Sequence, residues 1–180
     1  GSGGIMLPNH SPLIVAEQFG TLGSLYPNRI DLGLGRAPGT DQVTAQAIRS
    51  DRMQSVYKFP EEISQIQQYF SPANSAAKVR ATVAEGVDVP LYILGSSTDS
   101  AHLAAAKGLP YAFASHFAPT HMFEALNIYY NNFRPSEFLQ EPYTIACINV
   151  MAADTNEEAE KIHREKLEKL AGQPFHQGVV

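Results

Sequence analysis

Two stretches of the 180-residue sequence combine residue types that can hold an anion. In the first, RIDLGLGRAPGTD, a predicted strand with alternating apolar residues begins at Arg29 and ends in a glycine-rich turn that contains Arg36. Glycine lets a ligand approach the backbone closely, and a guanidinium offers planar, paired donors that suit a phosphate. Arg36 could instead pair only with a carboxylate at the end of its strand, and the residues alone leave both interpretations open.

The second stretch is LGSSTDSA, in which Ser96, Ser97, Thr98 and Ser100 stand where an apolar strand gives way to a helix. Backbone N–H groups at a helix N-terminus, nearby hydroxyls and the helix dipole together favour a bound anion. An ordinary Ser/Thr N-cap accounts for the same residues. In parallel α/β folds, ligands bind at the carboxyl ends of the strands, so two such turns after two neighbouring strands support each other.

Histidines near strand or turn ends are the other candidates for chemistry, and His116 is better placed than His10, His102 or His121. Their spacing matches no HExxH-like pattern, so we expect no metal site. A histidine at a strand end is more often a hydrogen-bonded structural residue than a catalyst. The sequence also lacks a GxSxG turn, and no catalytic residue is assigned.

Composition excludes several classes of function. The formal net charge of -5 argues against the basic surface of a nucleic-acid-binding protein. No apolar run approaches the roughly 18 to 20 residues of a membrane-spanning helix. The only cysteine, Cys147, cannot form an intramolecular disulfide, and its apolar neighbours predict a buried, inert thiol. We therefore expect a soluble, cytoplasmic protein.

Hydrophobic periodicity predicts an alternation of strands and helices. The expected strands cover residues 3–7, 29–35, 90–95, 109–115 and 143–151. The expected helices cover 12–26, most of 40–71, 96–107, 119–133 and a charged segment from Asp154 or Thr155 to about 170. Residues 71–89 are expected to be a surface excursion, either a loop or a short hairpin, and 172–180 an irregular tail. This order predicts a single α/β domain over 1–180, with about five parallel strands covered by helices.

The residues GSGGIMLPNHSPLIVAEQFGTLGSLYPNRIDLGLGRAPGTDQ and LYILGSSTDSAHLAAAKGLPYAFASHFAP resemble the bacterial luciferase-like flavin monooxygenases, in particular the branch of luciferase-family oxidoreductases. The resemblance extends to about residue 165. It implies a TIM-type (β/α)8 barrel that is here partial, because the match begins within the third barrel strand. On this alignment the first two strands, the reactive histidine that follows the second, and the eighth strand have no counterpart. The resemblance also suggests that the first three residues are native.

The resemblance further implies a cofactor and residues to hold it. Reduced FMN is the expected cofactor, with a deazaflavin less favoured, and its phosphate would be held by Arg36, Ser96, Ser97 and Ser100. Ser2 and Gly3 match the position of a non-prolyl cis peptide beneath the flavin ring in the family. At the position of Ser96 the luciferases have a glutamate, so a hydroxyl would make that contact here.

Two classes of function follow from the resemblance. The first is a monooxygenase that oxidises a small organic substrate with O2 and reduced FMN, supplied by a separate flavin reductase and working as a homodimer. The second is a binding module, a truncated barrel that carries flavin without turnover or carries none. Neither nucleic acid nor membrane is an expected partner.

Overall fold

The computed structural model describes residues 1–37, 40–48 and 51–171. Its contacts divide the chain into two units, Gly1–Cys147 and Ile148–Val180, which are described separately. The first unit contains the β-sheet, and the second contains helix α7 (Asn156–Ala171). The expectation of a single domain over 1–180 remains a prediction, and the expected tail at 172–180 lies outside the described residues.

One five-stranded parallel sheet forms the centre of the first unit, with the strands in chain order. The strands are β1 (Ile5–Met6), β2 (Leu32–Gly35), β3 (Leu91–Gly95), β4 (Tyr111–Phe113) and β5 (Thr144–Ala146). In the register, Leu34 of β2 lies between Ile5 and Ile93. Neighbouring parallel strands require crossover connections, and helices supply them along most of the chain. The α/β fold of a partial TIM-type barrel is therefore confirmed.

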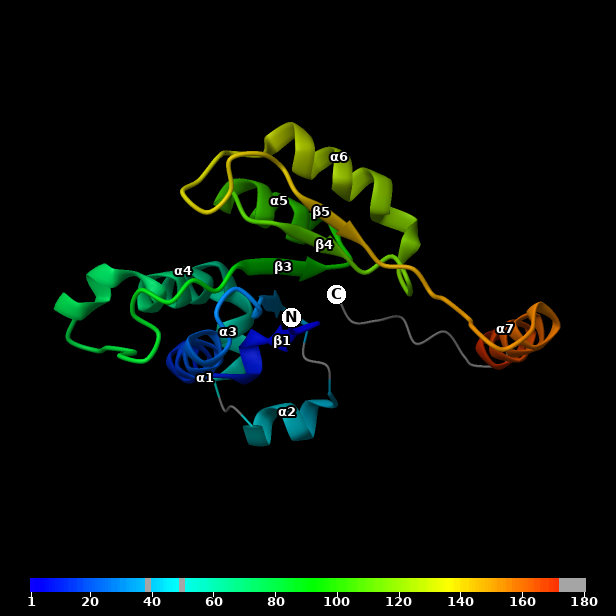
Figure 1. Ribbon diagram of the computed structural model, residues 1–180, viewed down its shortest axis with the longest axis horizontal. Helices are drawn as coiled ribbons and strands as arrows, with labels where there is room; N and C mark the ends of the chain where they lie inside the picture. The colour runs from blue at the N-terminus through cyan, green and yellow to red at the C-terminus, as the bar shows by residue number, and fades with distance from the viewer. Residues whose placement is uncertain (38–39, 49–50, 172–180) are drawn as a thin grey trace. The chain divides into compact units, whose positions relative to one another are not determined.

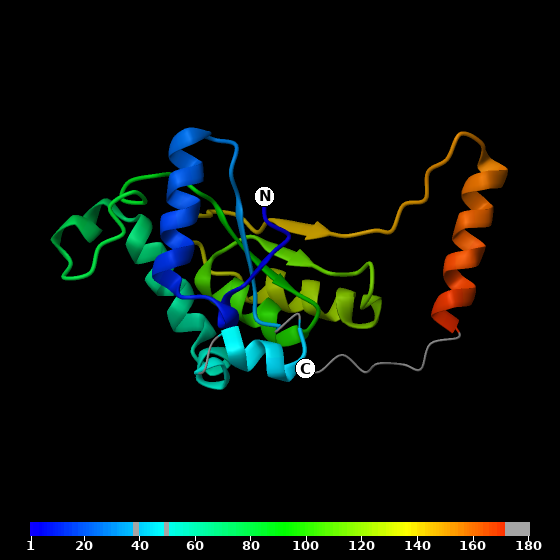
Figure 2. The same ribbon diagram turned by 90° about the horizontal axis from the view of Figure 1, so that it is seen from below.

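Helices follow each of the first four strands, and most of them pack in two groups. The α-helices of this unit are α1 (Pro12–Leu25), α2 (Gln42–Ile48), α3 (Arg52–Tyr57), α4 (Phe59–Phe70), α5 (Thr98–Lys107) and α6 (Met122–Asn132). Short 3-10 turns are η1 (Leu7–Asn9), η2 (Pro72–Ala76) and η3 (Pro119–His121). Helices α1, α3 and α4 form one group, in which α1 and α4 lie side by side, and α5 and α6 form the other (Figures 1 and 2). Gly108 ends α5 with a left-handed φ of 58°, as its place in the sequence predicts.

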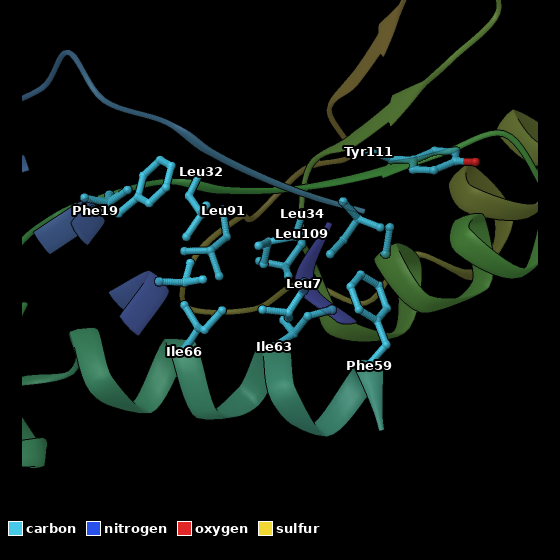
Figure 3. Packing of buried hydrophobic residues seen from close by; sticks show 14 of the residues in the cluster. Leu7, Phe19, Leu32, Leu34, Phe59, Ile63, Ile66, Leu91, Leu109 and Tyr111 are labelled. Atoms are coloured by element: carbon cyan, nitrogen blue, oxygen red, sulfur yellow. The ribbon is translucent and has the colours of Figure 1, made fainter. Parts of the chain in front are cut away.

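Helix α4 shows how the periodic pattern becomes a core. Its apolar residues recur at helical spacing, and Phe59, Ile63 and Ile66 are each at most 2% exposed. Figure 3 shows these three side chains projecting from α4 toward the sheet residues Leu32 and Leu34. Side chains alternate along a strand, so every second residue of β2 faces the helices. Gly33 and Gly35, which alternate with Leu32 and Leu34, face the other side of the sheet.

The last strand is shorter and more exposed than the sequence predicts. The sequence predicts a strand over residues 143–151, but β5 covers only Thr144–Ala146. Ile148 and Val150 are 80% and 71% exposed, and Cys147 is half-buried rather than fully buried. The physical reason is position: β5 is the last strand of the sheet, and within the described part of the chain it pairs only with β4. Apolar sequence indicates a strand, but a neighbour is needed to bury it.

Residues 71–89, all of which the structure describes, form η2 and a loop rather than a hairpin. The segment is more than a surface excursion, because Ala81 and Ala84 are fully buried against the core. The guanidinium of Arg80 donates to both carboxylate oxygens of Glu85 at 2.8 and 2.7 Å, which closes the loop. The loop thus packs as part of the unit and leads directly into β3.

Candidate functional site

The turn after β2 brings Arg36 to the start of helix α5. Nη2 of Arg36 lies 3.4 Å from Oδ2 of Asp99, and the two side chains are 40% and 65% exposed. Arg36 therefore contacts a carboxylate, but this carboxylate lies on helix α5 rather than at the end of the strand that precedes Arg36. An ion pair this exposed contributes little to stability, so the guanidinium remains available to a stronger anion. Pro38 and Gly39, in the same turn, lie outside the described residues.

Helix α5 begins directly after β3, with Ser97 in extended conformation at the N-cap. The first N–H groups of a helix have no partner within the helix, and they carry the positive end of its dipole. The side chain of Ser97 accepts no capping hydrogen bond from them. The helix start therefore offers backbone donors, half-buried hydroxyls at Ser96 and Ser100, and a nearby guanidinium. This donor set fits a phosphate, and the negative charge of the nearby Asp99 carboxylate opposes its binding.

Two hydroxyl groups meet beneath this helix start, one from Ser100 of α5 and one from Tyr111 of β4. Oγ of Ser100 donates to the carbonyl oxygen of Ser97 at 2.7 Å and lies 3.0 Å from Oη of Tyr111. Oη of Tyr111 donates to the same carbonyl oxygen at 3.1 Å. Tyr111 is fully buried, and burial raises the pKa of its phenol, so the hydroxyl stays protonated at neutral pH. Gly95 makes room for this arrangement, because a Cβ there would overlap the side chain of Ser100.

Ser2 lies one strand away and binds the backbone of β2. Its Oγ accepts from N–H of Gly33 at 2.9 Å and donates to the Gly33 carbonyl at 3.2 Å. Its own N–H donates to the carbonyl of Asp31 at 3.2 Å. The cis peptide expected at Ser2–Gly3 is absent, since every described peptide bond is trans. The trans form of a non-prolyl peptide bond is lower in energy by about 3 kcal/mol.

All four candidate histidines are exposed. His116 follows β4 on the exposed turn, and its ring packs edge-on against Phe117 with centroids 4.7 Å apart. Nδ1 of His121 lies 3.3 Å from Oε2 of Glu124 at the start of α6. His10 and His102 are exposed. Among the residues that the structure describes, no three His, Cys, Asp or Glu side chains cluster as a metal site would need.

The structure thus brings together Arg36, Ser97 and Ser100 through Asp99 and the first turn of α5. Ser2 and Gly3 lie just before β1, where Ser2 binds the backbone of β2. Sequence reasoning missed Asp99 and Tyr111. Asp99 had a detectable signal, because an acidic residue in the first turn of a helix is a natural partner for a nearby arginine. Tyr111 had no such signal, because in the sequence it is one of several large apolar residues of a buried strand.

The comparisons with known proteins identify the family of this chain. The family model described as luciferase-like monooxygenase matches residues 1–178. The chain is 58% identical over 168 residues to an uncharacterized protein, YddN, of Bacillus subtilis (strain 168), covering 93% of this chain and 50% of that protein. It is 53% identical over 160 residues to a luciferase-like monooxygenase of Escherichia coli (strain K12), covering 89% and 48%.

A solved structure, apo-MsnO8, superposes with a TM-score of 0.83 at 35% identity, covering 94% of this chain and 52% of that one. The chain therefore spans about half the length of the curated relatives it matches. No described helix is both long and apolar enough to cross a membrane. The family match over nearly the whole chain and the shared fold lead to one conclusion: this chain belongs to the luciferase-like monooxygenase family.

Proposed function

We propose that this chain holds the phosphate of FMN between Arg36 and the N-terminus of α5, as part of a flavin-dependent monooxygenase. The observation that carries the proposal is the convergence of a weakly paired guanidinium with the start of a helix, at the carboxyl ends of β2 and β3. Ligands of parallel α/β folds bind at this end of the sheet. Membership of a monooxygenase family supports the choice of a redox cofactor.

When bound, reduced FMN would supply the electrons for the reaction of O2 with a small organic substrate. The residues of this chain would bind and orient it. Arg36 would donate two parallel hydrogen bonds to the phosphate, and the backbone N–H groups after Ser97 would donate from the other side. Ser96 and Ser100 would add hydroxyl donors. Ser2 and Gly3 stay a prediction for the contact beneath the flavin ring.

The same proposal includes the working context of the protein. We expect a homodimer in the cytoplasm that receives reduced flavin from a separate reductase. Exposed apolar side chains on one face of α1, including Ile14, Leu22 and Leu25, support association with another protein surface. Light scattering of the full-length protein, with and without FMN, tests the dimer directly.

Paired titrations with FMN and riboflavin test the phosphate assignment, because the two ligands differ only in the phosphate. Arg36→Ala should weaken FMN binding about 10- to 100-fold, as expected for losing charge-assisted hydrogen bonds, and leave riboflavin binding unchanged. Arg80→Ala is the matched control, since it removes the same charge from a loop where Arg80 pairs with Glu85. Equal FMN affinities of Arg36→Ala and the control would contradict the proposal.

Turnover needs its own measurement. The full-length protein, supplied with FMN and a flavin reductase, should consume O2 faster when a substrate is present than when it is absent. FMN binding without substrate-dependent O2 consumption across a panel of small thioethers, amines and aldehydes would favour the non-catalytic binding module.

A further inference from the structure

Three oxygen atoms beneath the start of α5 share two protons. They are the Ser97 carbonyl oxygen, Oγ of Ser100 and Oη of Tyr111, separated by 2.7, 3.0 and 3.1 Å. Each hydroxyl carries one hydrogen, whereas the triangle has three edges of hydrogen-bond length. One edge must therefore lack a hydrogen, and the position of each proton depends on the other.

Tyr111 is the rigid member of this triangle. Its side chain is fully buried, and its ring packs against Phe113 and Tyr129 with centroids 6.2 and 5.5 Å apart. It belongs to the buried cluster drawn in Figure 3. Ser100 is only half-buried and lies on the first turn of α5, beside the phosphate site. A rotating serine hydroxyl can thus serve either the Ser97 carbonyl or an incoming anion.

We propose that Tyr111 is a positioning residue for the phosphate site, whose hydroxyl satisfies the Ser97 carbonyl and leaves the proton of Ser100 available to the anion. The inference rests on the proposed function and extends it to a residue that does not touch the ligand. Ser100 then donates outward to the phosphate while Tyr111 keeps the N-cap carbonyl paired. The Ser97 carbonyl therefore does not compete with the ligand for the serine proton.

Removing the Tyr111 hydroxyl reverses this arrangement. The Ser97 carbonyl then takes its side-chain hydrogen bond from Ser100, because a partly buried carbonyl that loses a partner holds strongly to the remaining donor. The phosphate loses one donor although Ser100 itself is unchanged. A ligand without a phosphate loses nothing.

The experiment measures dissociation constants for FMN and riboflavin with three variants. Tyr111→Phe keeps the ring and should weaken FMN binding about 10-fold, with riboflavin binding unchanged. Ser100→Ala should cause a similar loss. The double variant should be no weaker than Ser100→Ala alone, because both changes remove the same hydrogen bond.

Tyr129→Phe is the matched control. Tyr129 is also fully buried and its hydroxyl also donates to a backbone carbonyl, that of Leu109, at 3.0 Å. It should lose a similar amount of thermal stability and retain the ratio of FMN to riboflavin affinity of the unaltered protein. This control separates a general loss of stability from a specific loss of phosphate binding.

Several results would overturn the inference. One is a Tyr111→Phe variant with an unchanged affinity ratio, and another is a double variant whose loss is the product of the two single losses. If Tyr111→Phe does not fold, Ser100→Ala decides the matter, since an unchanged ratio there shows that the serine proton does not reach the anion. Failure of the unaltered protein to prefer FMN over riboflavin would instead refute the proposed function.

Discussion

Replacing Asp99 by asparagine should tighten FMN binding while slightly weakening helix α5. Asp99 lies in the first turn of α5, 3.4 Å from the guanidinium of Arg36, and occupies the place where we propose that a phosphate binds. A carboxylate there stabilises the free protein through the helix dipole and the ion pair. It opposes the same phosphate that the dipole and Arg36 attract.

The magnitude follows from Coulomb's law. Two unit charges about 5 Å apart in a water-like dielectric interact by about 0.8 kcal/mol, and a phosphate carries between one and two charges. Screening over a Debye length of about 8 Å at physiological salt roughly halves this energy. Asp99→Asn should therefore improve FMN affinity about 2- to 5-fold. Losing the helix-dipole interaction and an exposed ion pair should lower the free energy of unfolding by about 1 kcal/mol or less.

Isothermal titration with FMN and riboflavin at low and physiological salt is the assay. Asp88→Asn is the matched control, because it makes the same charge change at an exposed residue before β3 rather than after it. The five residues of β3 alone separate the two positions by about 16 Å, or about two Debye lengths. The control should leave FMN affinity unchanged, and the effect of Asp99→Asn should grow as salt is lowered.

A loss of FMN affinity in Asp99→Asn would refute the reasoning. It would mean that Asp99 positions Arg36 for the ligand rather than competing with it. An equal gain in riboflavin affinity would also refute it, because riboflavin has no phosphate for the carboxylate to repel.

Two further predictions concern stability. Ile63→Ala should lower the free energy of unfolding by about 2 to 5 kcal/mol in urea titrations, since Ile63 is fully buried. Val43→Ala, at a 79% exposed residue, should change it by about 0.5 kcal/mol or less. Similar losses in both variants would contradict the core assignment. Burial raises the pKa of Tyr111 and Tyr129 above 10.0, so the stability they contribute is complete below about pH 10 and is lost as the pH rises through the raised values. The urea concentration at the unfolding midpoint should therefore be lower at about pH 11 than at about pH 8. The lowered pKa of Lys107 acts in the opposite direction. A midpoint that does not change with pH would count against buried phenols.

Several elements were predictable from the sequence because local signals coincide there. Pro12 at the first helical position, Gly108 at the end of α5 and Thr155 at the cap of α7 each mark a boundary that the structure confirms. The alternation of apolar strands with helices predicted the parallel sheet. Local chemistry sufficed because caps and periodicity depend on residues within one or two turns.

The extent of burial was not predictable in the same way. Apolar sequence around Ile148 and Val150 indicated a buried strand, and the structure leaves both side chains exposed. Residues 71–89 contained turn formers that suggested a surface loop, yet Ala81 and Ala84 lie in the core. Burial depends on which element lies opposite, and a propensity carries no information about that neighbour.

The sequence by itself predicted two turns that could hold an anion, the order of strands and helices, and the family resemblance. Each of these predictions depends on residue types that lie close together in the sequence, such as the glycines around Arg36 and the serines before Asp99. Only the tertiary structure decided that Arg36 meets Asp99 across 63 positions of the chain and that Tyr111 supports Ser97 from the next strand. Such contacts arise because parallel strands place distant segments at one edge of a sheet, where packing rather than sequence separation sets which side chains meet.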